Sequence, residues 1–166
     1  VAPRVFDKLV AAGAKPLGHF ALDGCRVEKG FKHWGHDLDP TITPLEAGLG
    51  FIIDWSKDFV GKPVLEAQKA EGVRRRLILM QVDGDALMLH DEPVFEDTAH
   101  VGFTTSGARG PRTGLNVCFA MVAVRPSETL AETCQRHFTV RVAGQDYTAM
   151  PLRRAPFDPK NERMRG

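Results

Sequence analysis

The chain has 166 residues, of which 43% are hydrophobic, so it is long enough to bury a core and to form one domain or two small ones. Its 22 basic and 21 acidic side chains leave a formal net charge of +1, which excludes a general electrostatic attraction to nucleic acid or to an anionic membrane. The three cysteines are widely spaced and no long apolar run or signal-peptide pattern occurs, so the sequence predicts no disulfide framework, zinc ribbon or membrane-spanning segment.

Three helices are predicted in the first part of the chain. Apolar residues recur at helical spacing in residues 3–12, which begin with Pro3 and precede Gly13. Residues 19–29 show a second such pattern, closed by Gly30, and residues 62–70 a third, which ends at Gly72. The chain begins with Val1 rather than Met, so we expect a piece of a longer protein, and the cysteines favour a reducing compartment.

A capping pattern precedes a predicted strand between the second and third helices. Thr43, Pro44 and Glu46 form the sequence T-P-x-E, in which the threonine and the glutamate satisfy each other's backbone N–H groups. Gly48 then ends the turn, and the apolar run "LGFIIDW", residues 49–55, is typical of a strand.

The pattern changes after Gly72, where the hydrophobic period becomes two and turn residues recur about every ten positions. The predicted strands are "LILMQV" (77–82), "EPVFE" (92–96), "HVGFTTSG" (100–107), "LNVCFAMVAV" (115–124), "HFTVRVA" (137–143) and "DYTAMPL" (146–152). Residues 116–124 are apolar on both faces, as in a central strand. The sequence therefore predicts an α+β protein with a boundary near Gly72, between residues 1–72 and 73–166.

Two clusters of polar residues have the composition of metal or catalytic sites. His33, His36 and Asp37 are candidate metal ligands, but H-x-x-H places two imidazoles less favourably than the i, i+4 pair of known zinc helices, so we favour a structural role and predict no metal. His90 and its two acidic neighbours alternate faces in a β context, which favours a polar turn. Cys118 lies in an apolar strand and is best read as a small buried hydrophobe, and no catalytic residue is predicted.

Three further segments have a composition that bears on ligand binding. The glycines of "GLG", residues 48–50, lead into a strand rather than a helix, so they do not form a dinucleotide fingerprint. The segment "SGARGPRTG", residues 106–114, either presents backbone N–H groups and guanidiniums to an anion or is a flexible hairpin loop solvated by its arginines. The basic segment "RRAPFDPKNERMRG", residues 153–166, is predicted to be an exposed tail.

Several ordered motifs resemble the last part of the aminomethyltransferase family. They are "ALDGCRVEKGFKHWGHDLDPTITPLEAGLGF", "KDFVGKPVLEAQKAEGVRRRL" and "TSGARGPRTGLNVCFAMV". The family includes the glycine cleavage T-protein and the folate-binding half of dimethylglycine and sarcosine dehydrogenases. The run E-K-G-x-x-x-W-G-x-D from Glu28 to Asp37 and the terminal "DPKNERMRG" are more similar to the dehydrogenase branch.

The resemblance implies a tetrahydrofolate-dependent one-carbon transfer module. In the predicted division, residues 1–72 are the C-terminal part of a folate-binding aminomethyltransferase domain, and residues 73–166 are a small antiparallel β-barrel of the aminomethyltransferase type. The implied parent enzyme carries FAD in an upstream flavin-dependent oxidoreductase domain, outside this chain, which oxidises a small methylated amine. We expect neither nucleic acid nor a membrane as a partner, and a bacterial cytoplasm or a mitochondrial matrix as the compartment.

The resemblance also places the cofactor-binding residues. Phe31 matches a position that lines the folate pocket, and Trp34, Arg26 and Glu28 are its predicted neighbours, because a planar ring system suits aromatic contact and a few fixed polar groups. The alternative is structural: Arg26 and Glu28 pair with backbone and Trp34 fills the junction with the barrel. Leu22 stands where T-proteins have a folate-contacting arginine, and the family's acidic residue near the reactive folate nitrogen lies upstream of this chain.

Two other functions remain as alternatives at this point. One is a folate-dependent demethylase of another methylated compound. The other is a non-catalytic binding or assembly module, like the family's relatives in iron-sulfur cluster assembly, whose Lys-Gly-Cys-Tyr motif this chain lacks.

Overall fold

The computed structural model describes all residues from Val1 to Gly166 and has an α+β architecture. Its helices are α1 (Ala2–Ala11), α2 (His19–Glu28), α3 (Lys62–Glu71), α4 (Leu130–Thr133) and α5 (Glu162–Arg165), with a 3-10 helix at Gly50–Ile52. Its strands are β1 (Arg75–Val82), β2 (Pro93–Glu96), β3 (Ala99–Arg109), β4 (Asn116–Ala123), β5 (Phe138–Val142) and β6 (Gln145–Leu152). None of the helices has the length and apolar character needed to cross a membrane.

The six strands close into an antiparallel barrel in the order β1-β4-β3-β2-β5-β6, with β6 paired to β1. Closure gives every strand two partners, so no edge is left open. A cluster of 14 buried residues forms the main core, and all of them lie between Val73 and Ala149. The six strands predicted after Gly72 and the predicted small barrel are confirmed.

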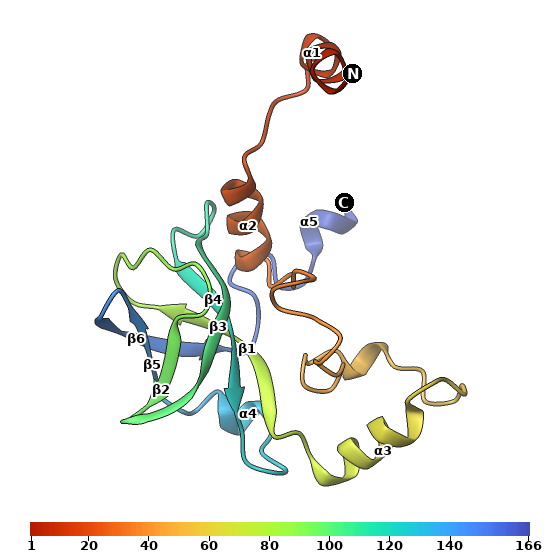
Figure 1. Ribbon diagram of the computed structural model, residues 1–166, viewed down its shortest axis with the longest axis vertical. Coiled ribbons are helices and arrows are strands. Elements are labelled where there is room, and N and C mark those ends of the chain that lie inside the picture. The colour runs from red at the N-terminus through yellow and green to blue at the C-terminus, as the bar shows by residue number, and fades with distance from the viewer.

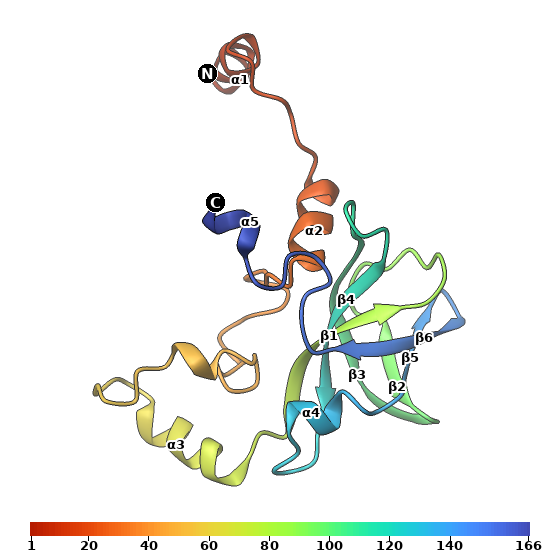
Figure 2. The ribbon, with the colours of Figure 1, turned by 180° about the vertical axis from the view of Figure 1, so that it is seen from behind.

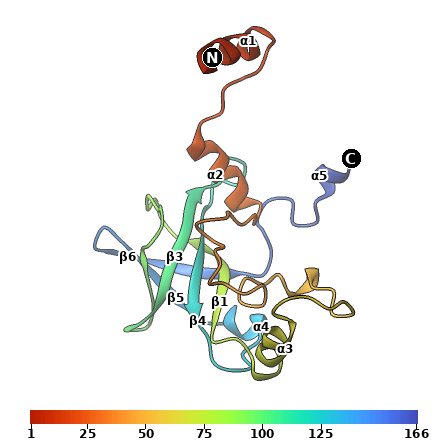
Figure 3. The same cartoon turned by 45° about the vertical axis from the view of Figure 1, so that its right-hand side comes forward.

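Strand β4 is buried on both faces because α2 covers its outer side. Cys118 and Val122 belong to the core inside the barrel. Val117 and Phe119 instead form a second cluster together with Val27 of α2. Figure 3 shows α2 lying across β3 and β4. The predicted central strand is confirmed, and its double apolar face is explained by one helix on the outside.

The three predicted helices are confirmed, but they differ in how they pack. Helix α1 has no buried residue, and Figure 1 shows it standing away from the barrel at the end of an extended linker. Its apolar residues Val5, Phe6, Leu9 and Val10 are all exposed. Helix α3 also has no buried residue. Only α2 among these helices is packed against the barrel strands.

The strand predicted at residues 49–55 is wrong. The segment forms the 3-10 helix instead, with Phe51 83% exposed and without any strand partner. Local hydrogen bonds satisfy its backbone: Leu49 N donates to Pro44 O at 2.7 Å and Ile52 N donates to Leu49 O at 3.0 Å. The capping contacts predicted just before it are present, since Thr43 N donates to Glu46 Oε2 at 2.9 Å.

The prediction of an exposed C-terminal tail is also wrong for its first half. After β6 the chain runs back to α2, as Figure 2 shows, and Phe157 N donates to Glu28 O at 3.1 Å. Lys29 Nζ lies 2.7 Å from Asp158 Oδ2, and both side chains are less than 10% exposed. The basic composition of the segment suggested solvation, but a buried ion pair to α2 fixes it in place.

Candidate functional site

The four predicted cofactor-binding residues lie at the end of α2 and in the loop that follows it. Helix α2 is set against the barrel by Val27, and its C-terminal residues face β3 and β4. Gly30 has a positive φ of 73°, which lets the chain leave the helix and turn back across the barrel. The four side chains then separate into two pairs, one turned inward and one turned to solvent.

Glu28 belongs to the inward pair and is 1% exposed. Its Oε2 accepts from Arg112 N, from Thr113 N and from Thr113 Oγ1, at 3.1, 3.1 and 3.2 Å. A side chain at Gly110 would collide with this carboxylate, so the turn needs glycine there. One interpretation of residues 106–114 was that they present backbone N–H groups to an anion. The turn after β3 does present such groups, and the group that accepts from them is the carboxylate of Glu28.

Arg26 is the other inward residue, with its side chain 11% exposed. Its Nε donates to Asp23 Oδ1 and its Nη1 donates to Asp37 Oδ2, both at 2.7 Å. Nη1 also lies 3.4 Å from Phe31 O and 3.3 Å from Ser106 Oγ. The guanidinium therefore joins α2 to the following loop and to β3.

For Asp37 the sequence favoured a structural role over metal ligation but gave no partner. Asp37 is fully buried and accepts from His33 N at 2.8 Å, from Thr105 Oγ1 at 2.5 Å and from Ser106 Oγ. With Arg26 it has four donors, which leaves no free lone pair pointing toward a metal ion. The run W-G-x-D was its only signal, since the partners in β3 are far away in the sequence.

Phe31 and Trp34 form the outward pair. Phe31 is 46% exposed and Trp34 is 67% exposed, so neither ring is part of the core. Lys29 Nζ lies 5.8 Å from the centre of the Phe31 ring while it pairs with Asp158. The structure thus places two aromatic faces in solvent on one short loop, and Trp34 does not fill the junction with the barrel.

Lys32 and the histidines complete the surroundings of this loop. Burial lowers the pKa of the Lys32 ammonium, an effect that the nearby Asp37 charge opposes. The His33 and His36 rings are 4.8 Å apart and His90, from the β1–β2 connection, is 5.6 Å from His36. No group of three or more His, Cys, Asp or Glu side chains is arranged to hold a metal ion.

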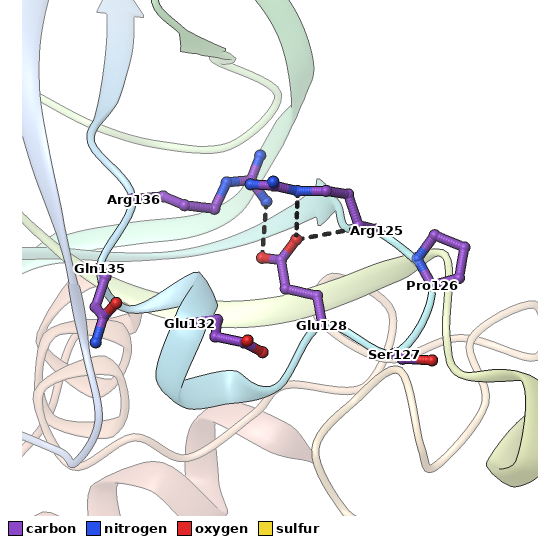
Figure 4. Close-up of a pocket in the computed structure, with 7 residues that line it drawn as sticks. All are labelled: Arg125, Pro126, Ser127, Glu128, Glu132, Gln135 and Arg136. Carbon is purple, nitrogen blue, oxygen red and sulfur yellow. Dashed lines mark hydrogen bonds and ion pairs between the residues drawn. The ribbon is translucent and has the colours of Figure 1, made fainter.

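A hollow of about 530 Å³ lies elsewhere, between the end of β4 and α4. Figure 4 shows its lining, in which Glu128 bridges Arg125 and Arg136. Arg136 is also paired with Glu96 at 2.6 Å. Because these charges already satisfy one another and no apolar wall is present, the hollow lacks the character of an organic-ligand pocket.

The three free cysteines differ in exposure: Cys25 is exposed on α2, and Cys134 is partly buried. Cys118 is fully buried in β4, and burial raises the pKa of its thiol far above the usual range. What the structure itself shows at this loop is two exposed aromatic rings, Phe31 and Trp34, next to the ionisable side chains of Lys32, His33 and His36.

Comparison with protein families matches two models in chain order. Residues 1–57 match the GCVT N-terminal domain, and residues 75–158 match the glycine cleavage T-protein C-terminal barrel domain. The second match contains all six strands of the barrel.

Curated relatives agree with these matches. An aminomethyltransferase of Nostoc sp. is 40% identical over 159 residues, which cover 95% of this chain and 41% of the relative. An aminomethyltransferase of Picosynechococcus sp. is 35% identical over 156 residues, with coverage of 93% and 41%. The chain thus spans about two fifths of the length of these relatives.

A solved structure has the same fold. The crystal structure of glycine cleavage system aminomethyltransferase T from Bartonella henselae superposes with a TM-score of 0.68 at 20% sequence identity. The superposition covers 81% of this chain and 37% of that chain.

Proposed function

This chain belongs to the glycine cleavage T-protein family, and from that premise we propose that it is the C-terminal folate-binding module of a tetrahydrofolate-dependent one-carbon transfer enzyme. The observation that carries the proposal is the pair of exposed rings, Phe31 and Trp34, on a loop fixed by buried polar contacts. Aromatic side chains that remain in solvent on an ordered loop suit stacking with a planar ligand.

Within this proposal the four predicted residues have two kinds of task. Phe31 and Trp34 contact the ring system of tetrahydrofolate, whose bound nitrogen atoms supply the chemistry of one-carbon capture. Arg26 and Glu28 belong to the same site, and their inward contacts hold α2 and the turn after β3 around it. Leu22 is 50% exposed, so a partly exposed apolar side chain stands where T-proteins have an arginine.

We further assign the module to the dimethylglycine and sarcosine dehydrogenase branch. The run from Glu28 to Asp37 and the terminal "DPKNERMRG" support this branch. In the proposed enzyme an upstream FAD-containing domain oxidises a small methylated amine, and this module receives the one-carbon unit. The exposed apolar face of α1 supports a larger enzyme, because such a face is normally covered.

The first test concerns folate binding in the intact enzyme. We expect Phe31→Ala to weaken tetrahydrofolate binding by about 1–3 kcal/mol, the range for loss of one aromatic stacking contact, and to leave amine oxidation unchanged. Isothermal titration calorimetry measures the affinity. Phe51→Ala is the matched control, since Phe51 is 83% exposed and lies outside the predicted site. Equal affinities of the wild type and a folded Phe31→Ala variant contradict the proposal.

The second test concerns the isolated chain of 166 residues. We expect it to release no formaldehyde from dimethylglycine or sarcosine, because its sequence has no dinucleotide-binding fingerprint and no convincing general base in a pocket. A colorimetric assay for formaldehyde, with the intact enzyme as the positive control, measures this. Turnover by the purified chain contradicts the assignment of the oxidation to an upstream domain.

We also propose that residues 1–72 and 73–166 are two domains that meet near Gly72. The change from the exposed helix α3 to a strand of the closed barrel supports this boundary. Limited digestion with trypsin is then expected to cut first near Arg74, which is exposed. Earlier cutting inside the buried strand β4 contradicts the division.

A further inference from the structure

One buried ion pair lies behind both exposed rings. Arg26 of α2 and Asp37 of the following loop are 2.7 Å apart, with side chains 11% and 0% exposed. Pairs that are removed from water in this way persist only where hydrogen bonds satisfy the rest of both groups. Here those hydrogen bonds go to the backbone that carries the rings and to the barrel.

The contacts of Asp37 close the loop and anchor it. Oδ2 accepts from His33 N at 2.8 Å, while Asp37 N donates to His33 O at 2.9 Å, so the residues on either side of Trp34 are tied together. Oδ1 accepts from the hydroxyls of Thr105 and Ser106 in β3. These hydrogen bonds fix the loop to a strand of the barrel.

The contacts of Arg26 reach the other ring. Nη1 donates to Asp37 and lies 3.4 Å from Phe31 O, and Phe31 N donates back to Arg26 O at 2.8 Å. Nε is taken by Asp23 at 2.7 Å. The Nε and Nη1 donors of the guanidinium are therefore engaged inside the protein, at the base of the loop that carries Phe31 and Trp34.

We propose that the Arg26–Asp37 ion pair is the positioning device of the ligand wall: it holds residues 31–37 in one conformation so that Phe31 and Trp34 present their rings together, and it makes no contact with the ligand itself. This inference rests on the proposed function for the identity of the ligand, tetrahydrofolate. The order of the loop is a property of this chain alone.

The test uses time-resolved fluorescence anisotropy of Trp34. The chain has two tryptophans, so Trp55→Phe isolates the signal, and every variant is made in that background. Asp37→Asn keeps the shape of the side chain but places an amide N–H₂ among donors, and Arg26→Lys keeps the charge but loses the fork that reaches two acceptors. We expect both to increase the amplitude of the nanosecond motion of Trp34 at least two-fold.

Arg136→Met is the matched control. Arg136 is also about 10% exposed and paired with carboxylates, but it follows α4 closely in the chain, and Figure 1 shows α4 away from α2. We expect it to leave the Trp34 anisotropy unchanged, so that a general loss of a buried ion pair is separated from the loss of this one. Circular dichroism verifies that each variant is folded, and Arg26→Lys decides the question if Asp37→Asn does not fold.

Affinity gives the second readout. In the intact enzyme we expect Arg26→Lys and Asp37→Asn to weaken tetrahydrofolate binding about ten-fold without a change in amine oxidation, whereas Arg136→Met leaves binding unchanged. Unchanged Trp34 anisotropy in folded Asp37→Asn or Arg26→Lys overturns the positioning role. An intact wild-type enzyme that binds no tetrahydrofolate refutes the proposed function instead, and the anisotropy then still decides whether the pair orders the loop.

Discussion

Residues 73–166 and residues 1–72 are held together by different forces. Eighteen of the twenty buried hydrophobic residues lie in the later region, and the earlier region contributes only Val27 and Ala47. What the earlier region does bury is charge: Glu28, Asp37 and Glu46 are the carboxylates among the buried residues. The barrel is therefore stabilised mainly by apolar burial, and the first 72 residues are joined to it mainly by directional polar contacts.

Each of these carboxylates bonds to a residue of the later region. Glu28 accepts from Thr113, Asp37 from Ser106, and Glu46 Oε1 from Arg75 at 3.0 Å. Directional contacts fix an orientation more strictly than apolar contact does, but they bury little surface. The first region is thus oriented on the barrel while its own apolar side, in α1, stays in solvent.

The largest difference in stability between the two regions is expected when one phenylalanine in each is replaced. Phe138 is 2% exposed in the core and Phe6 is 55% exposed on α1. We expect Phe138→Ala to lower the free energy of unfolding of the chain by about 3–5 kcal/mol through the cavity it leaves, and Phe6→Ala to change it by less than about 0.5 kcal/mol. Urea denaturation followed by circular dichroism measures both, and similar losses break the comparison.

A smaller effect is expected from one of the carboxylate contacts. Glu28→Ala leaves the N–H groups of Arg112 and Thr113 without their acceptor in a partly buried place, which costs about 1–3 kcal/mol. Amide hydrogen exchange at Thr113 is expected to accelerate, while exchange in the barrel core stays slow. Glu66→Ala on the exposed face of α3 is the control. Unchanged protection at Thr113 shows that the turn does not depend on Glu28.

The sequence predicted the barrel better than it predicted the contacts between the two regions. The reason is the separation along the chain of the residues that interact. A strand such as β4 can be predicted from the apolar pattern of fewer than ten consecutive residues. The bond from Thr113 to Glu28 spans 85 positions and that from Ser106 to Asp37 spans 69, so no local pattern reveals either partner. Arg26 and Glu28 were recognised as members of a site, but their inward direction required the fold.

The two errors in the fold have a similar origin. Residues 49–55 have the apolar composition of a strand, but a strand needs a partner, and local hydrogen bonds satisfy this backbone instead. Residues 153–166 have the basic composition of a tail, but Lys29 supplies a partner for Asp158 that is 129 positions away. In both cases the amino-acid composition of the segment does not reveal the contact that determines its structure.

Two capping boxes, one in each region, allow a test of whether the two regions unfold separately. Thr129 caps α4 with Glu132, and Thr43 makes the same reciprocal contacts with Glu46. We expect Thr129→Ala to lower the global stability by about 1 kcal/mol. Thr43→Ala is expected to leave the denaturation midpoint of the barrel unchanged and to accelerate only the local amide exchange of Glu46. An equal loss of global stability shows that the two regions unfold as one unit.

The smallest expected effect is a dependence on acid at the contact between the C-terminal segment and α2. The hydrogen bond from Lys29 holds the pKa of the Asp158 carboxyl below its usual value of about 3.9, against the opposing effect of burial. Because the carboxylate is favoured in the folded state, its contribution to stability is fully present above about pH 3.9 and is lost as the pH falls through the lower folded value.

The difference in the free energy of unfolding between the wild type and Asp158→Asn is therefore expected to be constant from pH 7 to pH 5 and to shrink below about pH 4. Thermal denaturation across this range measures the difference, with Asp58→Asn as the control, because Asp58 is exposed in the loop between the 3-10 helix and α3. A difference that grows on acidification shows that this ion pair does not hold the C-terminal segment to α2.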